Sequence, residues 1–177
     1  SRRLDVIPAQ FRVLVTRRPR YACRRCSQAV AQAHAPEHVV PGGLPTELFI
    51  ASIIVSKFGD HLPFYRQVEI FKRQGIDLDR GTLGNWVGRA CFHRMPGINH
   101  MKDHLRRADR IFVDETRAPV LDPGRKATKS GFFWAVVADD RGHGGAGPPI
   151  VLFHYPPGRG KEHPLKLLSA YRGLFLQ

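Results

Sequence analysis

Arg110-Ile111-Phe112-Val113-Asp114-Glu115 is a short apolar stretch that ends in two carboxylates. Its apolar run predicts a β-strand that is buried on both faces. A carboxylate at the end of such a strand is costly to bury unless it is paired or binds a cation. Asp114 is therefore interpreted either as a carboxylate tied to a nearby Arg or to backbone amides, or as a metal ligand. Glu115 should point to the opposite face, because side chains alternate along a strand.

The residues after this stretch predict two more strands, a helix and a fourth strand. Residues 131–138 and 150–155 are apolar runs separated by a turn-rich connection. Leucines at helical spacing follow over 162–171, and 173–177 begin another strand. This order resembles the opening of the ribonuclease H-like fold. That fold holds divalent ions between one carboxylate on its first strand and another just after its fourth. Magnesium suits such oxygen ligands.

The residues before the stretch read as helical from about 44 to 108. The first expected helix is apolar on nearly every side, so we expect it to be buried. Asp79 is a good N-cap for the third helix, and Pro96-Gly97 is expected to separate the third from the fourth. The expected helices cover residues 48–58, 63–74, 80–94 and 98–107.

The second and third expected helices resemble a helix-turn-helix. Residues near the front of a recognition helix contact base edges in the major groove of DNA. The alternative is a helical hairpin in which Leu83, Trp86 and Val87 pack a core, and we expect Leu83 and Trp86 to be core in either case. The candidate DNA-contacting residues are Arg80, Thr82, Asn85 and Arg89.

Residues 1 to about 43 are basic, with strand character over 11–16. Cys23 and Cys26 form half of a zinc site, because structural zinc takes four ligands. His34 and His38 could complete the site, although the proline between them argues against a helix there; free thiols or a redox pair are the alternatives. Arg24 and Arg25 stand between the cysteines and are further candidates for DNA contact, whereas Cys91 is expected to be a core residue.

The composition favours a polyanionic partner. Lys and Arg number 28 against 15 Asp and Glu, which gives a formal charge of +13 and a pI near 10.5. Binding to nucleic acid through release of phosphate counterions is the favoured interpretation, and a solvated basic surface is the alternative. The sequence has no apolar run long enough to span a bilayer, no secretory signal and no extracellular disulfide framework. We therefore expect a cytoplasmic, nucleoid-associated protein.

Several stretches in the same order resemble transposases of the insertion sequence 66 family. Val113-Asp114-Glu115-Thr116 looks like the family's first catalytic motif, with Asp114 as a magnesium-binding carboxylate. The stretch from Arg18 to Cys26 looks like its second zinc-binding cysteine pair. The other matching stretches are residues 4–11, 61–67, 75–83, 120–124 and 131–134.

The resemblance implies an α+β, multidomain chain. It would contain a partial zinc-ribbon-like segment (1–43), a helix-turn-helix-like domain (44–108) and the first half of a ribonuclease H-like core (109–177). The partner would be double-stranded DNA at transposon ends, and an unpaired last strand would favour self-association.

The family's first cysteine pair would lie before Ser1. Its second catalytic Asp would lie just past Gln177, and its Glu much further on. We therefore expect a partial DDE transposase that does not cleave DNA alone; the alternative is a non-catalytic DNA-binding protein or inhibitor derived from a transposase.

Overall fold

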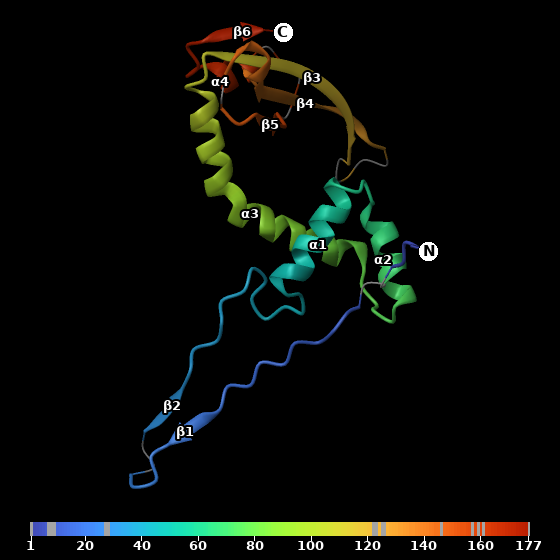
Figure 1. Ribbon diagram of the computed structural model, residues 1–177, viewed down its shortest axis with the longest axis vertical. Coiled ribbons are helices and arrows are strands. Elements are labelled where there is room, and N and C mark those ends of the chain that lie inside the picture. Colours follow the sequence, from blue (N-terminus) through green and yellow to red (C-terminus); the bar gives the residue numbers. More distant parts are fainter. Residues whose placement is uncertain are drawn as a thin grey trace.

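The computed structural model describes residues 2–6, 10–26, 29–121, 124, 127–145, 147–156, 158, 160 and 162–176. The fold combines helices and sheets, as the α+β prediction requires. Figure 1 shows a long N-terminal arm, a cluster of helices and a sheet, with α3 running between the cluster and the sheet. The elements are β1 (Arg20–Ala22), β2 (Val30–Gln32), α1 (Glu47–Phe58), α2 (Phe64–Arg73), α3 (Arg80–Leu105), β3 (Arg110–Val120), β4 (Lys129–Ala138), a 3-10 turn (Arg141–His143), β5 (Ile150–His154), α4 (Glu162–Leu168) and β6 (Leu174–Leu176).

α1 begins with a side-chain cap and is buried on one side only. The Thr46 hydroxyl accepts a hydrogen bond from the Phe49 amide at 3.2 Å. Ile50 and Ile53 are buried, but Leu48 remains 78% exposed. The prediction that this helix is buried all round is therefore wrong. An apolar composition does not determine how many neighbours a helix has, and among the described residues α2 and α3 pack against one side of α1.

The turn between α2 and α3 follows its sequence signals. Gly75 adopts a φ of 81°, the left-handed conformation that glycine supplies after a helix. Asp79 caps α3 by accepting hydrogen bonds from the amides of Gly81 and Thr82, at 2.7 and 2.9 Å. The predicted N-cap at Asp79 is confirmed. The core that these helices enclose contains Val40, Ile50, Ile53, Phe71, Leu83, Trp86 and Val87.

α3 does not stop at Pro96-Gly97, so the predicted break and the separate fourth helix are wrong. Proline removes one backbone hydrogen bond and kinks a helix, but it need not end one. Figure 1 shows α3 bending along its length. Residues 91–97 are all exposed, so the bend meets no packed neighbour. Cys91 lies in this stretch and is exposed, which corrects its assignment to the core.

The four-stranded sheet has the order β5-β4-β3-β6. β4 pairs antiparallel with β3 and β5, and β6 pairs parallel with β3. The predicted succession of three strands, a helix and a fourth strand is confirmed. β3 and β4 are longer than expected. Their outer parts, residues 116–120 and 129–133, pair only with each other, and we call this extension the β3–β4 ribbon.

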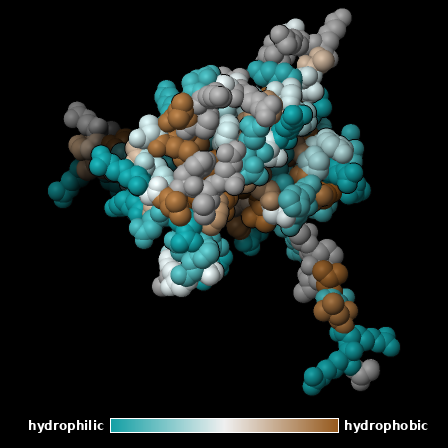
Figure 2. Space-filling model, turned by 90° about the horizontal axis from the view of Figure 1, so that it is seen from above, coloured by the Kyte–Doolittle hydropathy of each residue, from teal (hydrophilic) through white to brown (hydrophobic). Residues whose placement is uncertain are grey.

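The two faces of the sheet differ. One face packs against α4 and the end of α3 and buries Leu105, Ile111, Val113 and Val136. On the other face Phe153 is 67% exposed and Val151 is 46% exposed. β3 is therefore not buried on both faces, because helices cover only one of them. Figure 2, seen from above, shows apolar patches interrupting the hydrophilic surface.

The N-terminal arm carries a short hairpin of β1 and β2, paired antiparallel. The strand predicted over 11–16 is wrong, because this stretch pairs with no strand among the described residues, and Val13 and Val15 are exposed. Phe11 instead packs edge-on against Phe49 and Phe71, with ring centroids 5.6 Å from each, and so joins the arm to the helices. Among the helices of the described residues, none combines the length and apolarity needed to cross a membrane.

Candidate catalytic carboxylate and DNA-binding surface

Asp114 lies in the middle of β3, on the open face of the sheet. Its side chain is exposed, and its Oδ1 accepts a hydrogen bond from the Glu115 amide at 2.8 Å. Asp114 is paired with Ala135, which is paired with Phe153, so these three residues form one row across the face. The expectation of a buried carboxylate at a strand end is therefore wrong. Because the sheet's second face is open, the exposed Asp114 side chain needs no buried partner.

The parallel pairing of β6 with β3 ends two residues before Asp114. β6 runs parallel to β3, and Leu176 is paired with Phe112. Since parallel neighbours advance together, a chain continuing in this register reaches the side of Asp114 two residues after Leu176. A carboxylate at that position would stand beside Asp114. This is the geometry that two oxygen ligands of one divalent ion require.

The described residues alone do not complete a metal site. No group of three or more His, Cys, Asp or Glu side chains among them could hold an ion. Glu115 is adjacent to Asp114, but it shares the covered face with Ile111 and Val113, as strand alternation predicts. One carboxylate does not hold magnesium in a reactive geometry, so no cleavage step follows from these residues by themselves.

Cys23 and Cys26 lie in the turn of the β1–β2 hairpin, and both are exposed. Hydrogen bonds from the backbone amides of Cys26 and Arg25, and from the Cys26 thiol, lower the pKa of the Cys23 thiol. A lowered pKa favours the thiolate, which is the form that binds zinc. The two sulfurs supply half of a four-ligand site.

The histidines do not complete this zinc site. The His38 Nδ1 atom lies 3.0 Å from the Glu47 Oε1 atom at the start of α1, so His38 is engaged at the base of the arm. No described group of three ligands includes His34 or His38 with the cysteines. The suggestion that these histidines supply the remaining ligands is therefore not supported by their positions.

Basic side chains of the arm divide into two kinds. Arg18 donates to the Ala33 carbonyl at 3.1 Å, and Arg20 donates to the Gln32 side chain at 3.4 Å, so both help to hold the hairpin together. Arg24 and Arg25 project at the exposed turn beside the cysteines. An arginine at such a turn can reach a phosphate without disturbing the hairpin.

The predicted DNA-contacting residues at the front of α3 differ in their exposure and in their contacts. Arg80, Asn85 and Arg89 are exposed, and they lie away from the buried side of the helix. The Thr82 hydroxyl donates to the Asp79 carboxylate, so it serves the helix cap. Leu83, Trp86 and Val87 are buried, which confirms that they belong to the core.

Two carboxylates, Asp77 and Asp79, lie beside the front of α3, next to the predicted DNA-contacting residues. An open hollow of about 350 Å³ is lined by Asp77, Asp79, Thr82 and Trp86, with Leu44 and Leu78. Hydrogen bonds from the side chain and amide of Thr82 lower the pKa of Asp79, so this carboxylate remains ionised. Negative charge here disfavours a phosphate near the first turn. Asn85 and Arg89 are therefore better placed than Arg80 for contact with DNA.

The exposed side of α3 extends beyond the residues that the sequence suggested. His93 and His100 follow Arg89 at spacings of four and eleven residues, which keeps all three on one side of the helix. All three side chains are exposed. This continuation was missed because a break was expected at Pro96.

Two family models match this chain. The model described as the Transposase IS66 family matches residues 42–177, and the model of the zinc-finger binding domain of transposase IS66 matches residues 1–27. This chain belongs to the IS66 transposase family. The predicted resemblance is therefore confirmed, and the transposase match includes α1, α2, α3 and the whole sheet.

Three relatives of this IS66 family chain come from Sinorhizobium fredii (strain NBRC 101917 / NGR234). The uncharacterized protein y4qI is 41% identical over 98% of the chain and 32% of its own length. The uncharacterized protein y4jD is 45% identical over 98% of the chain and 34% of its own length. The uncharacterized protein y4hP is 37% identical over 97% and 30%. The chain thus spans about a third of the length of the curated relatives it matches. No solved structure matches it.

The family match bears on both candidate metals. The zinc-finger model includes Cys23 and Cys26, which supports zinc binding by this part of the IS66 transposase. The transposase model includes Asp114. Parts of two motifs that carried the resemblance, residues 7–9 and 122–123, lie outside the described residues, as does Gln177.

Proposed function

We propose that this IS66 family chain binds double-stranded DNA at transposon ends and acts in DNA transposition. Asp114 would be one ligand of the magnesium ions with which an intact relative cleaves and joins strands. The single observation that carries the proposal is the match of the transposase family model to residues 42–177. The position of Asp114 beside the end of β6 supports its assignment as a metal ligand.

The sheet supports a ribonuclease H-like assignment for residues 109–177. β3, β4 and β5 are antiparallel neighbours, and β6 returns through α4 to lie parallel to β3 on its other side. This brings the first and last of the four strands side by side, with Leu176 paired to Phe112, two residues before Asp114. Such a fold uses carboxylates from adjacent strands for phosphoryl transfer, and here the second carboxylate would follow β6.

Residues 44–108 are proposed to form the DNA-binding domain, with the exposed side of α3 facing the duplex. Asn85 is suited to reading a base edge, and Arg89 is suited to a phosphate or a guanine. Arg80 and Thr82 would contribute less, because Asp77 and Asp79 stand beside them. The arm, residues 1–43, would add phosphate contacts through Arg24 and Arg25 and bind zinc at Cys23 and Cys26 when further ligands are present.

A second candidate is a non-catalytic DNA-binding protein that occupies transposon ends and inhibits the active enzyme. The observation in its favour is that the described residues bring no second metal-binding carboxylate to Asp114. The two candidates share the DNA-binding surface and differ only in strand cleavage.

A binding experiment tests the shared part of the proposal. We would measure the affinity of the 177-residue chain for a duplex carrying the terminal sequence of its element, and for a shuffled duplex. Asn85→Ala should reduce the preference for the terminal duplex by roughly five- to a hundredfold, because a bidentate base contact contributes about 1–3 kcal/mol of discrimination. Arg89→Ala should weaken binding to both duplexes, and the matched control Arg73→Ala at the end of α2 should not.

Absence of duplex binding by the wild-type chain, or binding unchanged by Arg89→Ala, would overturn the proposal. Asp114→Asn provides the comparison for cleavage, because it removes the charge without changing the side-chain shape. Both candidates predict that Asp114→Asn leaves DNA affinity nearly unchanged. Magnesium-dependent cleavage that Asp114→Asn abolishes would select the enzyme. Because both candidates predict an uncut duplex for this chain alone, the second measurement adds the chain to an intact relative: reduced cleavage by that relative would select the inhibitor, and unreduced cleavage would count against it.

A further inference from the structure

The β3–β4 ribbon extends beyond the four-stranded sheet on the same strand as Asp114. β5 begins to pair with β4 only at Trp134, and β6 pairs with β3 only as far as Phe112. Among the described residues, 116–120 and 129–133 therefore have no further strand beside them. Tyr155 packs against Phe133 on one face, and both edges of the ribbon are open. The ribbon can contact a ligand without changes in the rest of the sheet.

The ribbon is basic. From Arg117 to Ser130 the sequence has four cationic residues, Arg117, Arg125, Lys126 and Lys129, and one carboxylate, Asp122. Arg125, Lys126 and Asp122 lie outside the described residues, so the argument rests on Arg117 and Lys129. Arg117 is paired with Phe132, whereas Lys129 is paired with Val120. Because side chains alternate along strands, these two cations project from opposite faces of the ribbon.

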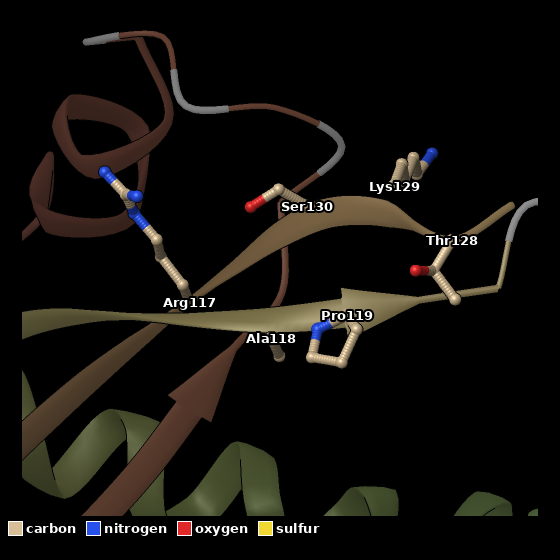
Figure 3. A pocket seen from close by; sticks show the side chains of 6 residues that line it. All are labelled: Arg117, Ala118, Pro119, Thr128, Lys129 and Ser130. Atoms are coloured by element: carbon tan, nitrogen blue, oxygen red, sulfur yellow. The ribbon is translucent and has the colours of Figure 1, made fainter.

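A shallow pocket of about 300 Å³ lies on the ribbon, lined by Arg117, Ala118, Pro119, Thr128, Lys129 and Ser130. Figure 3 shows Arg117 and Ser130 projecting from the same side of the two strands, with Thr128 and Lys129 nearer the end. The lining thus combines a guanidinium, an ammonium and two hydroxyls. All four groups donate hydrogen bonds, and phosphate oxygens only accept them.

Arg117 is held in place by its cross-strand partner. Its Cζ atom lies 5.9 Å from the centroid of the Phe132 ring, which is a cation–π arrangement. A guanidinium on an aromatic face keeps its planar N–H groups free at the edges. This arrangement suits a bidentate contact with phosphate.

We propose that the β3–β4 ribbon binds the phosphate backbone of DNA. The proposal rests on the proposed function and adds a second DNA contact that lies outside α3 and the arm. Arg117 is three residues from Asp114 along β3, so strand alternation places it on the face opposite Asp114, and its contact with a phosphate would be separate from the one at Asp114. Lys129 lines the same pocket at the end of the ribbon and would add a second cation for the backbone.

The salt dependence of DNA binding tests the ribbon contact. The double variant Arg117→Gln and Lys129→Gln should lower the slope of log affinity against log salt by about 2, because each phosphate contact contributes about 0.9. At about 0.1 M salt this corresponds to roughly a tenfold loss of affinity per cation. The loss should be equal for terminal and shuffled duplexes, because phosphate contacts carry no sequence information.

A matched control removes the same charge elsewhere. Lys166→Gln and Arg172→Gln change two exposed cations near α4 and should leave the slope almost unchanged. The charge-preserving pair Arg117→Lys and Lys129→Arg should keep most of the slope. If the ribbon variant and the control alter the slope equally, the ribbon inference is overturned while the proposed function stands. If the wild-type chain binds no duplex, both are overturned.

Lysine labelling of the wild-type chain gives a readout that needs no variant. A bound duplex should slow acetylation of Lys129, measured by mass spectrometry, and should leave Lys166 unaffected. Equal labelling of Lys129 with and without DNA, under conditions in which the chain is bound, would contradict the ribbon contact.

Discussion

The helical cluster and the sheet differ in how far they bury their apolar side chains. α1, α2 and the first half of α3 enclose their core from consecutive segments, so that Leu83 is 0% exposed and Ile53 is 1% exposed. The sheet receives helices on one face, and its other face leaves Phe153 67% exposed. A sheet needs a second packed layer wherever its face is apolar. The cluster encloses its core with residues close in sequence, whereas the sheet's second face leaves Phe153 and Val151 exposed.

This difference affects Asp114, because its carboxylate lies on the open face of the sheet. The Asp114 side chain is exposed, so the cost of burying a charge does not arise. A covering layer would exclude water and strengthen every electrostatic interaction at the site. The reactivity of Asp114 is thus expected to depend on what covers the sheet more than on β3 itself.

The largest expected effect comes from removing a buried side chain from the core of the helical cluster. Leu83→Ala should destabilise the helical cluster by about 2–5 kcal/mol, because it removes a fully buried side chain and leaves a cavity. Thermal unfolding followed by circular dichroism at 222 nm would measure the loss. The matched control Leu48→Ala alters an exposed leucine of α1 and should cost less than about 0.5 kcal/mol. An equal loss of unfolding free energy in the two variants would show that Leu83 does not lie in a packed core.

Local signals in the helical cluster could be predicted from the sequence. Asp79 and Gly75 each act through their own conformation and their nearest amides, so their types alone indicate a cap and a stop. Pro96 misled the prediction because the effect of a proline depends on what surrounds the helix. Where no side chain packs against residues 91–97, a kink is tolerated and α3 continues.

The order of the strands and helix in the sheet region could be predicted from the sequence. The lengths of the strands and the burial of their side chains were harder to predict. Apolar runs located β3, β4, β5 and β6, but the length of the β3–β4 ribbon depends on pairing between residues that are 9 to 17 positions apart in the sequence. Whether a face is covered depends on helices elsewhere, which explains why Asp114 was expected to be buried and is exposed. The type of residue at the candidate site could be read from the sequence, and its environment could not.

The open face of the sheet should cause concentration-dependent association. Phe153→Ser should change unfolding free energy by less than about 1 kcal/mol, because the side chain is largely exposed. It should nevertheless lower the fraction of dimers and larger species in sedimentation velocity experiments, since it removes apolar surface from the face. Val55→Ser, on the exposed side of α1, is the matched control and should leave association unchanged. If Phe153→Ser leaves association unchanged, the open face of the sheet is not the surface through which the chain associates. A change in association caused by Val55→Ser would instead assign that surface to the helical cluster.

The smallest expected effect concerns an ion pair at the end of β4. Arg141 donates to both carboxylate oxygens of Asp139, at 2.9 and 2.7 Å, and these hydrogen bonds lower the pKa of Asp139 to about 2. A carboxyl whose pKa falls on folding stabilises the folded state above its unfolded pKa, and this contribution disappears as the pH falls through the folded value. The melting temperature of Asp139→Asn should therefore lie slightly below that of the wild type at neutral pH, and the gap should close as the pH approaches about 2. Arg141→Gln should reproduce the same pH-dependent gap, because it removes the other half of the pair. A gap that stays constant to the lowest pH at which both proteins fold would show that Asp139 acts through its shape and not through its charge.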